Sequence, residues 1–156
     1  MVNKKINRIL TPTLAALMAL MTINVLWQVF SRYILQSPSS FTDELARYLL
    51  IWLGMLGAAY AAGQGNHLAI DLLSDRLNNS QQIVVRRIIS SLIITFVFAV
   101  MVIGGGRLVY ITGKLNQTSA ALHIPLTVVY AIIPISGALI ILYEMERLVG
   151  NRFRRV

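Results

Sequence analysis

The chain contains no cysteine among its 156 residues, which excludes disulfides, thiol catalysis and thiolate metal sites. Charged residues are scarce, at 13% against about 25% in soluble proteins. There are two histidines, His67 and His123, and no nucleophile–base pair or glycine-rich phosphate loop accompanies them. These shortages favour a protein that is not an enzyme, with no catalytic residue, cofactor or metal site of its own.

Apolar residues are abundant instead. They make up 56% of the chain, and the mean hydropathy is +0.69, whereas soluble domains have about 45–50% apolar residues. They are gathered in four long runs, and a helix needs about 20 such residues to cross a bilayer. The pattern predicts an all-α integral membrane protein, a single membrane domain over residues 1–156, with transmembrane helices at 9–31, 44–65, 86–106 and 125–144.

The first run lies between Arg8 and Arg32 and carries no charge. It is longer than the core of a secretory signal peptide, which has about 7–15 residues. We therefore expect an uncleaved membrane anchor, with a cleaved signal peptide as the lesser alternative.

Basic residues predict the orientation. Ten of the fourteen Lys and Arg residues lie in the N-terminal segment, the 64–87 connection and the C-terminal tail, and such an excess marks the cytoplasmic side. Both termini should thus be cytoplasmic, with residues 66–79 forming a short amphipathic segment at the inner interface. Because the net charge of +8 sits in clusters beside apolar runs, it indicates contact with the lipid bilayer and not with nucleic acid.

Polar residues mark the outer end of the first helix. Asn24, Gln28 and Arg32 recur every four residues, which places them on one helical face. They are either interfacial polar residues beside an aromatic belt that includes Trp27, or a seam facing another helix or subunit, since an unpaired amide in lipid is costly.

The second helix begins with a hydroxyl and two acids. Ser40 or Thr42 can cap it, and acids in the first turn suit the helix dipole. We interpret Asp43 and Glu44 as capping residues that pair with Arg32 or Arg47; a paired-carboxylate site is the alternative. Small residues follow at four-residue spacing, which lets membrane helices approach closely: Gly54, Ala58 and Ala62, and in parallel Gly57, Ala61 and Gly65.

The third and fourth predicted helices contain glycine and proline at positions that affect where each helix ends or bends. Three consecutive glycines, Gly104 to Gly106, mark either the outer terminus of the third helix or a close contact. Pro125 suits an early helical position, and Pro134 predicts a kink.

The centres of all four helices lack an acid or base, the usual mark of an ion pathway. A scaffold or partner subunit therefore fits better than an independent carrier. The alternative is a stand-alone four-helix exporter of the small multidrug type, which needs an acid in its first helix.

The chain resembles the small permease subunit of TRAP (tripartite ATP-independent periplasmic) transporters over roughly residues 10–145. The resemblance rests on Trp27 with Phe30-x-Arg32-Tyr33, on Asp43-Glu44-Leu45-x-Arg47-Tyr48 with Trp52 and Gly57-Ala58, on His67-x-x-Ile70, and on Pro125 and Pro134.

The resemblance implies a bacterial inner-membrane scaffold that works with a large permease subunit, in a one-to-one pair, and with a periplasmic substrate-binding protein. The large subunit would carry the organic acid, such as a C4-dicarboxylate or sialic acid, and bind sodium in an elevator-type movement. The residues expected at the subunit interface or in the periplasmic-end network are Asn24, Trp27, Gln28, Arg32, Asp43, Glu44, Arg47, Tyr48, Trp52, Gly54, Gly57, Ala58, Ala61 and His67.

Overall fold

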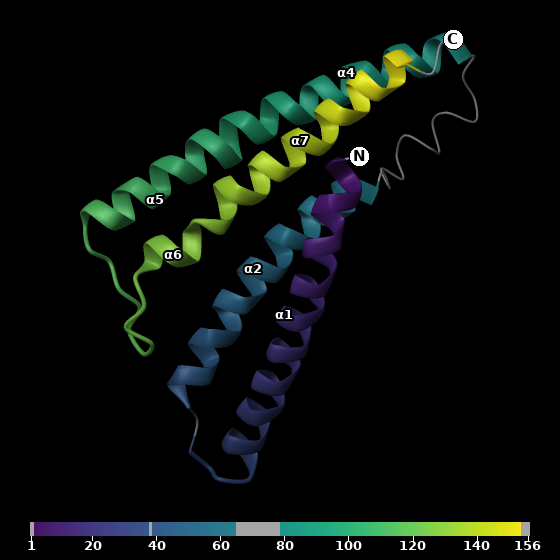
Figure 1. Cartoon of the computed structure of the whole chain (residues 1–156). Helices are drawn as coiled ribbons and strands as arrows, with labels where there is room; N and C mark the ends of the chain where they lie inside the picture. Colours follow the sequence, from purple (N-terminus) through teal and green to yellow (C-terminus); the bar gives the residue numbers. More distant parts are fainter. Residues whose placement is uncertain (1, 38, 65–78, 154–156) are drawn as a thin grey trace.

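A computed structural model describes residues 2–37, 39–64 and 79–153, which are helical apart from three short connections (Figure 1). Four of its helices are long and apolar enough to cross a membrane, which confirms the predicted fold class at that level. The elements are α1 (Val2–Tyr33), α2 (Ser40–Gln64), α4 (Asn79–Val97), the π-helix η1 (Phe98–Gly104), α5 (Gly105–Lys114), α6 (Leu126–Tyr130) and α7 (Ile132–Phe153).

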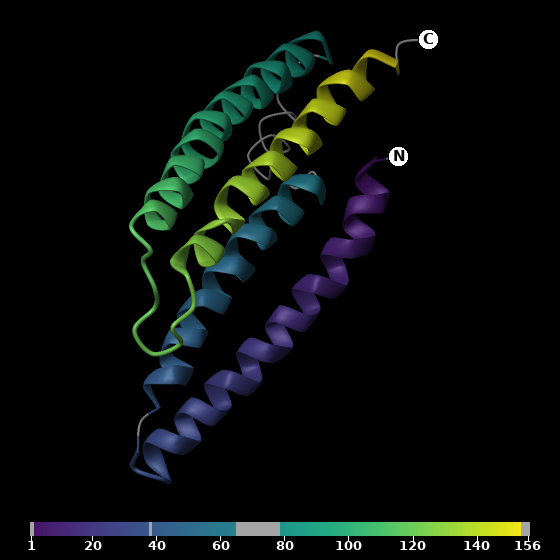
Figure 2. The same cartoon turned by 60° about the vertical axis from the view of Figure 1, so that its left-hand side comes forward.

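The helices form two hairpins, with α2 lying between α1 and α7 (Figures 1 and 2). The first hairpin is α1 and α2. In the second, the continuous rod of α4, η1 and α5 packs against α6 and α7. The start of α1 meets α7 where the Tyr143 hydroxyl donates to Asn7 Oδ1 at 2.7 Å; we call this the terminal end. The opposite end, with the 34–39 turn and the 115–125 connection, is the loop end.

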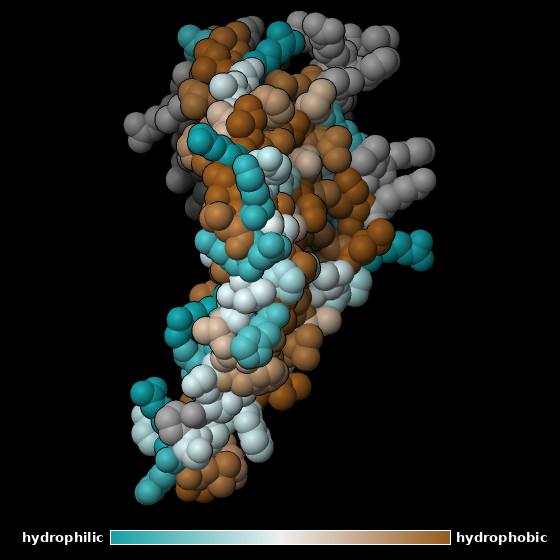
Figure 3. Space-filling model, turned by 90° about the vertical axis from the view of Figure 1, so that its left-hand side faces the viewer, coloured by the Kyte–Doolittle hydropathy of each residue, from teal (hydrophilic) through white to brown (hydrophobic). Residues whose placement is uncertain are grey.

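The packed core is small for a chain of this length. Among the described residues its buried apolar side chains form two groups, with Val129 and Tyr143 also buried: Ala59, Ala62, Val97 and Ile140, and Leu10, Leu56 and Ile132. Many large apolar side chains are exposed, such as Ile23 at 65% and Leu92 at 66%. Hydrophobic residues cover much of the face in Figure 3, and more hydrophilic ones gather toward the loop end. This distribution suits helices surrounded by lipid or by another membrane protein.

Glycines set the closest helix contacts. A Cβ atom added at Gly137 of α7 would lie 2.8 Å from Met101 Cβ of η1, and one at Gly105 would lie 2.8 Å from Ile133 Cγ2. At Gly63 of α2 the nearest atom would be Tyr143 Cζ, also at 2.8 Å. Glycine therefore lets α7 approach the third span on one side and α2 on the other.

Two sequence interpretations change here. The glycine triplet does not end the third helix, which continues through Lys114; the close-contact alternative holds, because Gly105 packs against α7. Pro125 precedes the first residue of α6 instead of lying within it.

The predicted kink is confirmed. The fourth span is interrupted at Ala131, between α6 and α7. Proline has no N–H, and its ring clashes with the carbonyl four residues earlier, which for Pro134 is that of Tyr130. The interruption thus lies one turn before the proline, as that clash requires.

Residues 65–78 lie outside the described part of the chain. They hold His67, Gly65 and nearly all of the predicted amphipathic segment 66–79, so these predictions stay predictions. The orientation of the termini in the membrane also stays a prediction.

Candidate functional site

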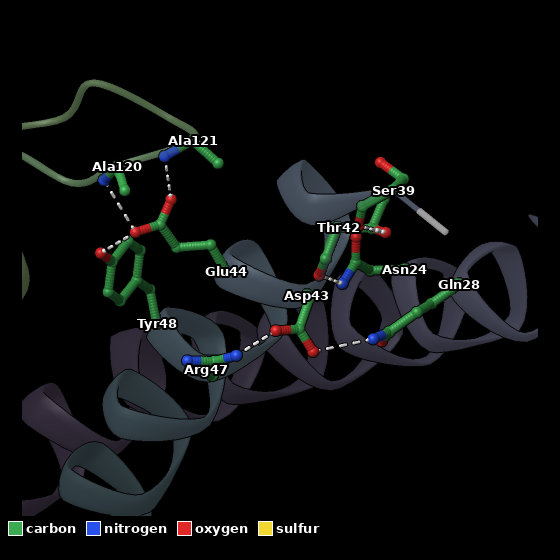
Figure 4. A network of polar contacts seen from close by, with 10 residues as sticks. All are labelled: Asn24, Gln28, Ser39, Thr42, Asp43, Glu44, Arg47, Tyr48, Ala120 and Ala121. Carbon is green, nitrogen blue, oxygen red and sulfur yellow. Dashed lines mark hydrogen bonds and ion pairs between the residues drawn. The ribbon is translucent and has the colours of Figure 1, made fainter. Parts of the chain in front are cut away.

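A carboxylate at the loop end joins the two hairpins. Glu44, in the first turns of α2, accepts hydrogen bonds from three consecutive backbone N–H groups: Ala120 at 3.2 Å, Ala121 at 2.7 Å and Leu122 at 3.0 Å. The Tyr48 hydroxyl donates to the same carboxylate at 2.8 Å (Figure 4). Successive N–H groups that point inward form a nest for an anion, and here the anion is a side chain of the same protein.

The local fold explains why these N–H groups face Glu44. Residues 119–123 make one helical turn, closed by the bond from His123 N to Ser119 O at 3.2 Å. The first N–H groups of such a turn have no backbone partner within it, although Leu122 N also donates to Ser119 Oγ at 3.2 Å. His123 then takes a left-handed conformation, with φ of 54°, and the chain reverses so that Thr118 bridges Pro125.

The neighbouring acid, Asp43, has different partners. Gln28 Nε2 of α1 donates to its Oδ1 at 3.0 Å, and Arg47 forms an ion pair with it. The two carboxylates point toward different groups in Figure 4, so a paired-carboxylate site is not formed. The predicted pairing of Asp43 with Arg47 is confirmed, while Glu44 binds backbone N–H groups instead of either arginine.

The polar seam of α1 faces α2. Asn24, 8% exposed, donates to the Thr42 carbonyl at 2.8 Å, and Gln28 reaches Asp43. Of the two interpretations, the seam toward another helix holds for these two residues, and the helix is one of the same chain.

Arg32 is different from the rest of the seam. It lines a hollow of about 470 Å³ together with Gln28, Ser39, Ser40, Asp43, Glu44, Arg47, Ala120 and Ala121. Among the described residues it makes no ion pair with Asp43 or Glu44. Of the two arginines predicted as alternatives for pairing with the acids, Arg47 is the one that pairs, with Asp43.

The predicted helix cap is also corrected. Since α2 begins at Ser40, Ser40 and Thr42 lie inside the helix. The Thr42 hydroxyl donates to the Ser39 carbonyl at 2.9 Å, and Asp43 N donates to that carbonyl at 3.3 Å. Ser39 therefore takes the position that precedes the helix.

The other predicted residues lie elsewhere. Trp27 is 52% exposed and stacks on Phe30, with ring centroids 5.9 Å apart. Trp52 packs against the core of its own chain. The small residues of α2 leave an open strip on the surface: nothing lies within 4 Å of a Cβ added at Gly54 or Gly57, and Ala58 and Ala61 are exposed.

A second polar network, at the terminal end, has no counterpart in the sequence interpretation. Glu144 of α7 is fully buried, and its Oε1 accepts from Arg147 Nη1 at 3.2 Å. Arg147 Nη2 donates to the Ala62 carbonyl of α2 at 3.2 Å. The sequence does contain a signal for this network: Glu144 lies at the end of an apolar run, and Arg147 follows it by one helical turn.

Both networks connect helices, and they lie at opposite ends of a protein with four helices long and apolar enough to cross a membrane. Their hydrogen bonds fix the positions of α1, α2 and α7 and of the 115–125 connection. This defines the class: a membrane protein whose polar residues hold helices in place.

Comparison with known proteins identifies the family. The model of the DctQ component of tripartite ATP-independent periplasmic transporters matches residues 21–154. The chain belongs to this family, the small permease subunits of TRAP transporters. The family is a transporter component and not an enzyme family, and with four spanning helices the protein is a multi-pass protein of the inner membrane.

Relatives agree with this assignment. The chain is 28% identical to a TRAP transporter small permease protein of Haemophilus influenzae over 148 residues, which is 95% of this chain and 90% of that protein. It is 33% identical over 113 residues to the sialic acid TRAP transporter small permease protein SiaQ of Vibrio cholerae, covering 70% of this chain and 59% of SiaQ. It is 25% identical over 142 residues to the isethionate TRAP transporter permease protein DctMQ of Oleidesulfovibrio alaskensis. This match covers 87% of this chain and 22% of that protein.

Proposed function

We propose that this small TRAP subunit is the scaffold of a sodium-gradient-driven importer of organic acids. In this role it supports a large, elevator-type permease subunit that binds substrate and sodium, and it helps a periplasmic binding protein to dock. The loop end would face the periplasm and both termini the cytoplasm. The terminal end and its flanks hold most of the basic residues, which supports this orientation.

The observation that carries the scaffold role is the open strip of small residues on α2, formed by Gly54, Gly57, Ala58 and Ala61. Small residues let a second membrane helix approach closely, and no helix of the described chain fills this strip. Asn24, Gln28, Asp43 and Glu44 at the loop end are meanwhile bound within the chain, so the strip is the best-suited contact for a large subunit.

The relatives support the partner and the substrate class. The chain matches only 22% of the isethionate permease DctMQ, so in that relative the small-subunit sequence is one part of a longer permease. A single fused polypeptide there is consistent with the one-to-one pair that we propose here. Sialic acid and isethionate are both organic anions, and we extend that class, without choosing a member, to this protein.

Uptake in proteoliposomes tests the function. The small and large subunits are reconstituted together, and a radiolabelled organic acid is supplied with its binding protein. We expect uptake only with both subunits, the binding protein and an inward sodium gradient. Transport by this chain alone would overturn the scaffold role and favour the four-helix exporter.

The interface has its own test. Gly54→Leu combined with Ala61→Leu should leave the chain folded, because both positions are open, but should block the close approach of the large subunit. We expect co-purification of the two subunits to fall at least about tenfold, since tight helix contacts depend on small side chains.

The matched control for this interface is Ala19→Leu, on the exposed face of α1, which should assemble normally. Normal assembly of the double variant, with loss of assembly in Ala19→Leu, would place the interface on α1 instead.

A further inference from the structure

Two interruptions of α-helix lie side by side in the second hairpin. The seven residues of η1 are π-helical, whereas π-helix usually occurs as single-turn bulges, frequently at functional sites. On the facing helix, α6 ends at Tyr130 and α7 begins at Ile132. The two sites are in contact, because Gly105, directly after η1, packs against Ile133 and Pro134.

The part of the hairpin beyond both interruptions is tied together internally. We call α5, residues 115–125 and α6 the outer lobe. Gln117 N donates to Thr112 O at 3.1 Å, and Leu126 N donates to Gln117 O at 2.9 Å. Gly113 of α5 lies against Thr127 of α6, where an added Cβ would be 3.5 Å from Thr127 Oγ1. These contacts join the two short helices of the lobe to each other.

The backbone of the outer lobe is hydrogen-bonded to the first hairpin at one side chain, and α6 also contacts α2. In the part of the chain that the structure describes, the hydrogen bonds from the lobe backbone to the α1–α2 hairpin all end on the Glu44 carboxylate. Hydrogen bonds to an ionised acceptor are about twice as strong as neutral ones. Asp43, next in sequence, is bonded within its own hairpin to Gln28 and Arg47.

We propose that the outer lobe moves as a unit about η1 and the α6–α7 interruption, and that Glu44 is the latch that holds it against α2. Latched, the lobe and the first hairpin form one loop-end surface. Released, the lobe can turn away while the rest of the bundle keeps its packing. This device goes beyond the scaffold role and does not depend on transport, so it is tested on the chain itself.

Distance measurements between spin labels test the latch. The chain has no cysteine, so two labels can be introduced without background, in the full chain in lipid nanodiscs. One pair, Phe41→Cys and His123→Cys, joins α2 to the lobe; a control pair, Phe41→Cys and Leu92→Cys, joins α2 to α4. All three positions are exposed.

We expect Glu44→Gln to broaden the 41–123 distance distribution and to leave the 41–92 distribution unchanged. Amide hydrogen exchange at residues 120–122 should become at least about tenfold faster, because the ionised acceptor is lost. The matched control, Asp43→Asn, removes the adjacent charge and should change neither distribution.

A second variant tests the pivot. Pro134→Ala restores an N–H that can bond to the Tyr130 carbonyl and continue the helix, so in the Glu44→Gln background it should narrow the 41–123 distribution again. An unchanged 41–123 distribution in Glu44→Gln would overturn the latch, as would equal broadening of both label pairs. Failure of Pro134→Ala to narrow the distribution would overturn the pivot.

Discussion

Replacement of Arg147 by methionine is expected to lower the free energy of unfolding by about 3 kcal/mol, because the variant loses two hydrogen bonds donated by a charged guanidinium, each of which contributes about 1.5–3 kcal/mol. Glu144 is fully buried, and Arg147 donates to its carboxylate at 3.2 Å. Arg147 also binds the Ala62 carbonyl, so the variant loses a link from α7 to α2. Reversible unfolding in mixed detergent micelles measures the effect.

The double variant Glu144→Leu with Arg147→Met separates the two contributions. When both ions of a buried pair are replaced by apolar side chains, stability is often unchanged or higher. We therefore expect the double variant to regain most of what Arg147→Met loses. If it is as unstable as the single variant, the bond to Ala62 and not the ion pair stabilises this end. A loss below about 0.5 kcal/mol, the usual range for a surface substitution, would contradict the prediction.

Composition predicts the spanning helices of this protein well, because an uncharged run long enough to cross the thickness of a bilayer is typical of a transmembrane helix. Helix ends are predicted less well. The low helix propensity of the Gly104–Gly106 triplet predicts a helix terminus, yet the helix continues to Lys114. The reason is tertiary: at Gly105 the missing side chain makes room for Ile133, and the packing outweighs the low propensity of glycine.

At the loop end, the local pairs are the ones that the sequence reveals. Asp43 and Arg47 are four residues apart on one helix, and Asn24 and Gln28 share a face, so spacing alone brings them into the network. The contact of Glu44 with Ala121 spans 77 positions, and its donors are backbone N–H groups. Any residue type except proline has a backbone N–H group, so the sequence of residues 119–122 does not indicate that these groups bind Glu44.

The same limit applies to the terminal end. Glu144 ends an apolar run, where an acid usually lies at the membrane surface. Its complete burial depends on how α7 meets α2, and that contact is set by Gly63 against Tyr143. The sequence shows the charge and the glycine separately, and only the packing shows that one makes room for the other.

Gly137→Ala is expected to lower the free energy of unfolding, whereas Gly54→Ala is expected to raise it, although both glycines lie within spanning helices. Alanine gains about 0.8–1.0 kcal/mol over glycine in a helix interior, so Gly54→Ala should stabilise the chain slightly, since its added methyl group meets nothing within 4 Å. At Gly137 the same methyl group lies 2.8 Å from Met101 Cβ and 3.3 Å from Val102 Cγ2. Overpacking costs about 1–3 kcal/mol, which exceeds the gain.

Gly137→Leu should be the most damaging change, because Met101 Cβ is fixed to the η1 backbone and cannot move aside as a side-chain tip could. We expect α7 and η1 to separate and the folded chain to be lost from detergent extracts, as measured by gel filtration of a fluorescent fusion. Gly54→Leu is the matched control and should give a wild-type elution profile. Normal folding of Gly137→Leu would mean that α7 can shift along η1 to admit a large side chain, and the close contact would then not determine how this hairpin packs.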